Sequence, residues 1–297
     1  MSAPAVWTAE DTEDVVCCLC GLPGTLVHDV APFGVVRCPQ CALVFISPRL
    51  RPEALQRLYD DVGYFEGGVY GNALSSSALS GSTASGSAPS DGDAAEAGGG
   101  RFSPAMLLQR TWTAGRLRLI EREHGGAPAG GRLLEVGAGY GLFLAAARAA
   151  GWKTSGVELS RTGAGHARDT LGLDVFCGQV EDAPLTPGFD VVCAWDTVEH
   201  VPDPLAFWRT ARSLVADDGV VLFSTPYYSS LPARLLGTRW WTLKPTEHIW
   251  HFTPRTHALL LARAGFALTE VVRNPLAPAN AARLDSLVGI ARPIPGT

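Results

Sequence analysis

Between residues 103 and 294, short apolar runs alternate with longer stretches whose apolar residues recur every three or four positions. The short runs are bounded by glycine or an acid and predict buried strands, whereas the longer stretches predict helices. The expected strands are 133–136, 152–158, 173–178, 190–194, 217–226, 266–272 and 286–294. The expected helices are 103–123, 145–151, 159–172, 204–214 and 254–264, and the buried side of the first should carry Met106, Leu107, Trp112, Leu117 and Ile120. Strands alternating with helices predict an α/β domain.

The first strand runs into a turn in which Gly137, Gly139 and Gly141 occupy alternate positions. Glycines are needed where backbone passes close to a ligand, because a Cβ would collide with the ligand or forbid the turn. The helix that follows offers unpaired N–H groups at its start. The dinucleotide fingerprint G-x-G-x-x-G would put its last glycine where this chain has Leu142. The turn therefore predicts a ligand site with a different spacing.

This G-x-G-x-G turn, with Glu135 two residues before it, resembles motif I of class I S-adenosyl-L-methionine (SAM)-dependent methyltransferases. The resemblance runs from about Arg101 to Pro293, and its nearest branch is the ubiquinone-biosynthesis O-methyltransferases. It implies an α/β fold with a seven-stranded Rossmann-like sheet in the order 3-2-1-4-5-7-6, ending in an antiparallel hairpin. It also implies that the turn cradles the methionine and ribose parts of SAM.

Further candidates for binding SAM follow the next strands. Glu158 ends the second strand, about twenty residues past the turn, where a carboxylate can accept both ribose hydroxyls. It could also cap a helix, and an NAD enzyme would need the same acid. The sequence GQVEDAPL resembles motif III, where Gln179 would bind adenine, with Glu181 and Asp182 as alternatives. The expected SAM-binding residues are Glu135, Gly137, Ala138, Gly139, Gly141, Glu158, Leu159, Gln179, Val180, Trp195 and Asp196.

Three histidines are candidates for the general base, because imidazole titrates near neutrality. His200 lies in the sequence VEHVPDP after the fourth strand and could instead hold that turn by a hydrogen bond. His248 and His251 lie in the aromatic-rich insertion 227–254, which we expect to line a small-molecule pocket over the strand ends. Their spacing would also suit a metal ion if the segment were helical, but no third ligand is evident.

Five of the seven cysteines lie near the N-terminus. Two C-x-x-C pairs suit a tetrahedral structural zinc ion, and we expect about one zinc per chain. Cys18 could replace Cys17, and a redox role for one pair would leave the other unexplained. The expected zinc ligands are Cys17, Cys20, Cys38 and Cys41.

The residues after this zinc ribbon, which end in LYDDVGYF, resemble the zinc-binding segment in front of some bacterial methyltransferases. That resemblance implies that Tyr64 and Phe65 approach the active site, although packing between domains would explain them equally well. Residues 67–100 are small and polar and predict a disordered linker or a long surface loop. The expected organisation is a zinc-ribbon module with a connecting helix at 1–66, this linker at 67–100, and a methyltransferase domain at 101–297.

Composition and charge narrow the choice of partners. A net charge of −5 argues against a nucleic-acid surface. We find no apolar run long enough to cross a bilayer and no signal pattern, so we expect a cytoplasmic location. The sequence does not indicate the oligomeric state.

The leading hypothesis is methyl transfer from SAM to a small molecule such as a sugar, natural product or quinone-like acceptor, with oxygen as the expected accepting atom. Methylation of carbon or nitrogen on a nucleotide sugar or secondary metabolite stays open. A second hypothesis is a non-catalytic SAM-binding or zinc-ribbon interaction protein. A third, an NAD-linked oxidoreductase, is disfavoured by Leu142.

Overall fold

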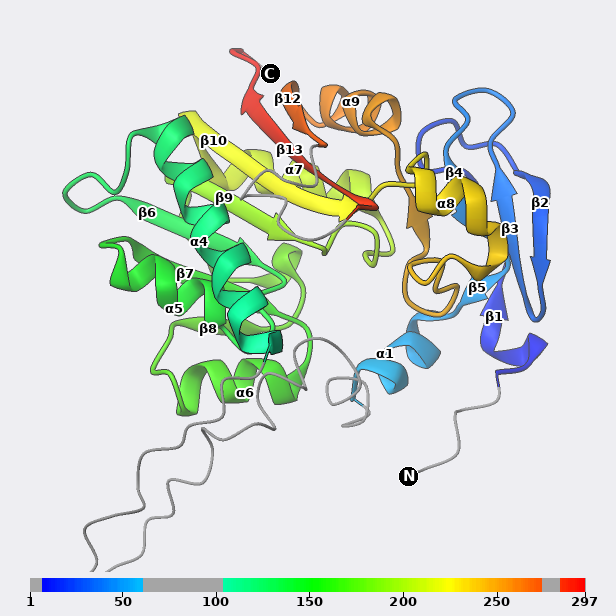
Figure 1. Cartoon of the computed structure of the whole chain (residues 1–297), viewed down its shortest axis with the longest axis horizontal. Helices are drawn as coiled ribbons and strands as arrows, with labels where there is room; N and C mark the ends of the chain where they lie inside the picture. The colour runs from blue at the N-terminus through cyan, green and yellow to red at the C-terminus, as the bar shows by residue number, and fades with distance from the viewer. Residues whose placement is uncertain (1–6, 61–103, 274–283, 297) are drawn as a thin grey trace, which may run out of the picture.

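The computed structural model describes residues 7–60, 104–273 and 284–296, and a seven-stranded sheet forms the centre of its larger part (Figure 1). The strands are β6 (Arg132–Val136), β7 (Lys153–Glu158), β8 (Val175–Cys177), β9 (Phe189–Trp195), β10 (Val215–Pro226), β12 (Phe266–Val272) and β13 (Ser286–Pro293). Their spatial order is β12-β13-β10-β9-β6-β7-β8. Only β13 runs antiparallel to its neighbours. Numbered along the chain, this is the expected order 3-2-1-4-5-7-6, which is confirmed.

Helices cover both faces of this sheet (Figure 1). One face carries α4 (Pro104–His124), α5 (Leu142–Ala149) and α6 (Arg161–Asp169), and the other carries α7 (Pro204–Leu214) and α9 (Pro254–Arg263). Successive residues of a strand point to opposite faces, so Leu133 packs with the first group of helices and Leu134 with the second. Burial on both sides explains why these strands are almost continuously apolar.

Two details of the helices differ from expectation. Helix α5 begins at Leu142 because Gly141, with φ of +79°, already acts as its N-terminal cap. In α4, Trp112 and Ile120 are buried as the apolar spacing predicts. Leu107 was expected on the same buried side, but 64% of its surface is exposed, so that prediction is wrong.

The N-terminal residues form a second sheet that takes up a strand from far along the chain. Its order is β11-β4-β3-β2, and its strands are β2 (Thr25–Val30), β3 (Phe33–Arg37), β4 (Val44–Ile46) and β11 (Trp250–His251). The smaller elements around it are β1 (Thr12–Glu13), β5 (Arg49–Leu50), α1 (Pro52–Asp60), α8 (Leu231–Leu236) and the short 3-10 helices Ala9–Asp11 and Gly237–Arg239. The insertion predicted over the strand ends thus completes the N-terminal sheet.

The two sheets share one hydrophobic core. Phe45 of β4 packs in the same buried cluster as Trp250 of β11 and Leu260 of α9. On the other side of the N-terminal sheet, α8 contributes Ala233 to a cluster with Val35. The side chain of Arg263 also donates a hydrogen bond to the carbonyl of Leu19. The ribbon is therefore docked onto the larger part by buried contacts.

Two of the sequence predictions concern residues that the structure does not describe. The expected linker 67–100 falls outside the described residues, and so do Tyr64 and Phe65. Within the described part of the chain, no helix has the length and apolar character needed to cross a membrane.

Candidate active site

A cavity of about 1090 Å³ opens at the carboxyl ends of β6, β7, β8 and β9. One part, the glycine-turn half, is lined by residues 135–140, 158–159 and 178–181. The other part, the histidine half, is lined by residues 199–203, 241–242, 244, 247–248 and 284–286, with Pro52 and Leu55 of α1. Ligands of open α/β sheets bind at this edge, so the cavity is the natural site for a reaction.

Most of the predicted site residues line this cavity. They are Glu135, Gly137, Ala138, Gly139, Glu158, Leu159, Gln179, Val180, Trp195, Asp196, His200 and His248. Gly141 and His251 are not among the lining residues.

The three glycines of the turn do different things, although all have positive φ. A Cβ on Gly137 would collide with the side chain of Thr197, and a Cβ on Gly141 would lie 2.6 Å from Leu173 of the α6–β8 connection. A Cβ on Gly139 would meet nothing within 4 Å. Gly137 and Gly141 are therefore required by packing, while Gly139 borders open space where a ligand can approach the backbone.

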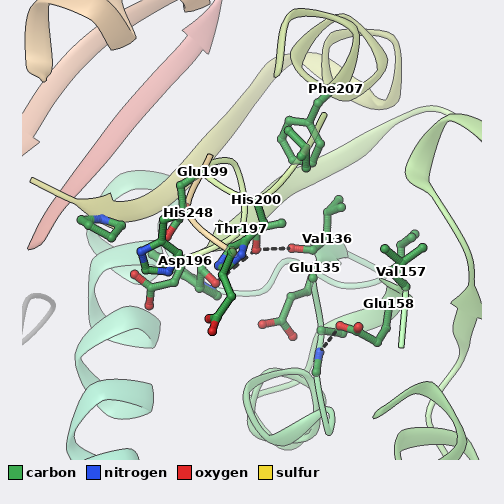
Figure 2. Close-up of a pocket in the computed structure, with 18 of the residues that line it drawn as sticks. Glu135, Val136, Val157, Glu158, Asp196, Thr197, Glu199, His200, Phe207 and His248 are labelled. Atoms are coloured by element: carbon green, nitrogen blue, oxygen red, sulfur yellow. Dashed lines mark hydrogen bonds between the residues drawn. The ribbon is translucent and has the colours of Figure 1, made fainter. Parts of the chain in front are cut away.

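Glu158 closes the floor of the glycine-turn half. One carboxylate oxygen accepts a hydrogen bond of 2.7 Å from the N–H of Gly139 (Figure 2), and the other accepts one of 2.7 Å from the N–H of Ser160. Burial raises the pKa of Glu158, and these backbone hydrogen bonds oppose the shift. A carboxylate offers about four lone-pair sites, so this one keeps capacity for a diol.

Glu135 is the second buried acid of this half, with 3% of its surface exposed. Its Oε2 atom has no hydrogen-bond partner among the described residues. Burial raises its pKa well above the ordinary value, and the nearby guanidinium of Arg116 opposes this. A cationic ligand group would satisfy this oxygen and restore its charge. The ammonium group of SAM has this chemistry, so the residues present fit SAM.

Arg116 of α4 is a site residue that the sequence reasoning missed. Its Nη2 lies 3.3 Å from Oδ2 of Asp196, and its guanidinium lies 4.6 Å from the centre of the Trp195 ring. Asp196 has φ of +52°, and its N–H donates to the carbonyl of Ser224. The helix thus holds the carboxyl end of β9 at the boundary between the two halves.

In the histidine half, His248 is held by a hydrogen bond of 2.7 Å between its Nδ1 and the carbonyl of Thr242. A carbonyl only accepts, so Nδ1 carries the proton and Nε2 keeps a lone pair. Burial lowers the pKa of His248 well below its ordinary value, and His200 adds to this shift. Burial lowers the pKa of His200 to about 4, against the opposing charge of Glu247. Both imidazoles are therefore neutral at pH 7.

The His200 and His248 rings meet edge to face, with 4.7 Å between their centres. Glu199 joins them, because one ligand atom from each of the three residues lies within 4.8 Å of the others (Figure 2). Two imidazoles and a carboxylate at this spacing have the donor set of a divalent-metal site. The sequence did not reveal Glu199 as a partner of His248, since the two are far apart along the chain.

His251 lies elsewhere. Residues 248–251 are not helical, and β11 carries His251 into a cluster with the rings of Tyr228 and Trp240, whose centres lie 5.6 and 6.0 Å from its own. Both of its ring nitrogens lack a hydrogen-bond partner within the described part of the chain, and burial lowers its pKa to about 3. The suggestion that His248 and His251 bind a metal ion together required a helix, and this segment is not one. The metal-binding side chains nearest to His248 are instead those of Glu199 and His200.

The cysteines of the ribbon gather at a second possible metal site. The Sγ atoms of Cys17, Cys20, Cys38 and Cys41 all lie within 4.8 Å of one another. The two pairs have matching turns, in which the N–H of Gly21 donates to Cys17 and the N–H of Ala42 donates to Cys38. Four thiolates in two such turns fit tetrahedral zinc. Cys18, the alternative ligand, is not part of this cluster.

Comparison with known proteins agrees with this geometry. Residues 107–271 match the family described as "Methyltransferase domain". A ubiquinone biosynthesis O-methyltransferase of Actinobacillus pleuropneumoniae is 31% identical over 137 residues, which cover 42% of this chain and 56% of that protein. A protein of the same name from Neisseria meningitidis is 36% identical over 105 residues, covering 32% and 44%. The chain thus spans about half the length of the curated relatives it matches.

Among solved structures, a SAM-dependent methyltransferase from Clostridium acetobutylicum superposes with a TM-score of 0.50 at 12% identity. The match covers 62% of this chain and 92% of that protein. At this identity the likeness concerns the fold alone. Together with the family match over more than half of the sequence, it shows that the chain belongs to the methyltransferase domain family, with the fold of SAM-dependent methyltransferases.

Proposed function

We propose that this protein transfers the methyl group of SAM to a hydroxyl group of an uncharged small molecule, with His248 accepting the hydroxyl proton. The observation that carries the proposal is the single cavity that joins the glycine-turn half to a neutral, oriented imidazole. The family match supports the first part, and the names of the curated relatives, which are O-methyltransferases, support oxygen as the accepting atom.

In the glycine-turn half, Glu158 would grip the ribose hydroxyls and Glu135 the ammonium group, while Gln179 at the rim would bind adenine. SAM supplies an activated methyl group on a sulfonium, so the chain mainly has to align the acceptor oxygen behind that methyl carbon. As the new O–CH₃ bond forms and the CH₃–S bond breaks, the hydroxyl proton passes to Nε2 of His248. Thr242 holds the ring in the tautomer that makes this transfer possible.

The charge of the cavity favours an uncharged acceptor. Two basic residues, Arg116 and Lys244, line it, and Arg116 is already paired with Asp196. The carboxyl-bearing lining residues are Glu135, Glu158, Glu181, Asp196, Glu199, Asp203, Glu247 and Asp285. SAM brings positive charge that suits these acids, whereas a phosphate would meet repulsion. A neutral sugar, a natural product or a quinone-like phenol therefore fits better than a nucleotide sugar.

The proposal is tested by incubating the protein with methyl-labelled SAM and a panel of neutral sugars, catechols and their phosphate esters. We expect label in a neutral acceptor, and fragmentation of the product should locate it on oxygen. Label on carbon or nitrogen would support the alternative chemistry, and SAM binding without any transfer would support a non-catalytic role. Faster transfer to phosphate esters would contradict the charge argument.

A second role for the histidine half rests on the cluster of Glu199, His200 and His248. A divalent cation held there would bind the acceptor oxygen and lower the pKa of its hydroxyl. Dialysis against a chelator followed by return of Mg²⁺, Mn²⁺ or Zn²⁺ separates the two mechanisms. Activity that survives chelation favours His248 as the base, and activity that returns only with metal favours a metal-bound acceptor.

We also infer a structural zinc ion at Cys17, Cys20, Cys38 and Cys41. When bound, zinc would tie together four thiolates of a module that is too small to hold a core alone. Metal analysis of the purified protein should find about one zinc per chain, and the variant Cys38→Ser should lose it. A metal-free preparation with an unchanged melting temperature would contradict this inference.

A further inference from the structure

The loop that carries Glu199 and His200 is held by the N-terminal ribbon rather than by the methyltransferase sheet alone. The segment Ile249–His251 lies between the ribbon and this loop. On one side the N–H of Ile46 in β4 donates to the carbonyl of Ile249 at 3.0 Å. On the other side the N–H groups of Ile249 and Trp250 donate to the carbonyl of Glu199 at 2.9 and 3.2 Å. A chain of backbone hydrogen bonds therefore leads from the ribbon to the loop.

Two side chains reinforce this chain of contacts. The indole Nε1 of Trp250 donates to the carbonyl of Val201 at 2.8 Å. Arg49 of β5 donates from Nη1 to the carbonyl of Pro202 at 3.0 Å, and its guanidinium lies 5.8 Å from the centre of the Trp250 ring. Three of the four carbonyls between Glu199 and Pro202 thus accept hydrogen bonds from the ribbon and its added strand.

Arg49 is itself anchored in the ribbon. Its Nε lies 3.2 Å from a carboxylate oxygen of Glu13 in the paired strand β1, and its side chain is 12% exposed. A guanidinium can bond two partners at once because its donors lie in a rigid plane. Trp250, at its other side, is 3% exposed and packs on Phe45 with 5.7 Å between ring centres.

We propose that Arg49 and Trp250 are positioning residues, through which the ribbon fixes the His200–His248 pair of the histidine half. His200 belongs to the loop that they hold, and His248 directly precedes the segment that they brace. The glycine-turn half receives no such contact from Arg49 or Trp250, so SAM binding is independent of them. This inference deepens the proposed function, since it concerns the same histidines, but its first test needs no turnover.

The test uses the whole 297-residue chain loaded with zinc, and the variant Arg49→Met, which keeps much of the aliphatic stem and loses every side-chain donor. Arg51→Met is the matched control, because Arg51 is a neighbour in the same module whose Nε donates to the carbonyl of Glu10, away from the loop. Trp250→Phe keeps an aromatic ring but removes the donor to Val201. Zinc content and melting temperature are recorded for each variant to establish that it is folded.

The readouts are the imidazole Cε1–H signals of His200 and His248 in NMR spectra, and the Kd for SAM by calorimetry. We expect Arg49→Met and Trp250→Phe to shift or broaden both signals while the Kd for SAM stays within about twofold. With an acceptor found by the panel above, kcat should fall about tenfold or more, the effect of losing alignment. Arg51→Met should leave the two histidine signals, the Kd for SAM and kcat unchanged.

The proposal is overturned if the two histidine signals of Arg49→Met match those of the wild type, or if Arg51→Met shifts them as much. It is also overturned if the Kd for SAM weakens in proportion to kcat, because the residues would then support the whole fold. If no compound of the acceptor panel is methylated, that result counts against the proposed function alone, because the NMR comparison does not require turnover.

Discussion

The two halves of the cavity are built from different kinds of contacts. The glycine-turn half uses the ends of three adjacent parallel strands, β6, β7 and β8, and its hydrogen bonds join Glu158 to backbone close by. The histidine half combines α1, the loop after β9 and the insertion before β11. The residues of a site built on neighbouring strands of one sheet can be predicted from the sequence. The residues of a site assembled from distant segments cannot, because their positions depend on how those segments pack together.

The comparison predicts that binding and turnover can be separated by mutation. The largest effect is expected for His248→Gln, which removes the proposed base while leaving the glycine-turn half intact. The value of kcat should fall about 10²–10⁴-fold, the usual contribution of a general base, with the Kd for SAM unchanged. His251→Gln is the control in the same segment and should cost far less turnover. Equal losses in both variants would contradict the assignment.

The converse separation is expected for Glu158→Ala. Two hydrogen bonds from the ribose to a charged group are worth about 3 kcal/mol together, or about 100-fold in Kd. Calorimetry should therefore show a Kd for SAM about 100-fold weaker. Glu181→Ala removes a rim acid of the same half and should change the Kd only slightly; if it weakened binding as much, the assignment of the ribose carboxylate would be wrong.

Within the glycine-turn half, Gly141→Ala and Gly139→Ala distinguish packing from ligand contact. A methyl group on Gly141 would press on Leu173 and Ala167 in a left-handed backbone. We expect a loss of about 1–3 kcal/mol in the free energy of unfolding, measured with urea. Gly139→Ala should cost less stability but weaken SAM binding more, since its Cβ would point into open space. The opposite ranking would contradict the roles assigned to these glycines.

The smallest effect concerns pH. Because the pKa of folded His251 is about 3, its unfolded form gains a proton below pH 6.5 that the folded form does not. The free energy of unfolding should therefore fall as pH drops from 6.5 toward 3, and each such histidine contributes up to about 1.4 kcal/mol per pH unit. His251→Phe should make this slope shallower in urea titrations at pH 7, 6 and 5. A slope unchanged by the substitution would argue against a neutral, buried His251.

The individual strands and helices could be predicted from local apolar periodicity, and the glycine turn from the spacing of its residues. The order of the strands in the sheet followed from the resemblance to class I methyltransferases, because alternation of strands and helices alone does not fix that order. For Gly141 the structure adds a packing reason, because a Cβ there would clash with Ala167 of α6 and with Leu173. A glycine required by packing and a glycine required by a ligand look alike in one sequence.

The histidine half was only partly predictable. His200 and His248 were picked out by residue type, but nothing local indicated that the segment of His251 would be a strand of the ribbon sheet. Arg116 and Glu199 were missed because their partners are distant in sequence, Asp196 for one and His248 for the other. Zinc binding, the domain boundaries and the cytoplasmic location stay predictions.

The central claim is that the glycine-turn half binds SAM rather than a dinucleotide. Calorimetric titration of the wild-type protein with SAM and, separately, with NAD⁺ tests it most directly. The account predicts saturable binding of one SAM per chain and no measurable heat with NAD⁺. Binding of NAD⁺ as tight as that of SAM, or no binding of SAM at all, would contradict it.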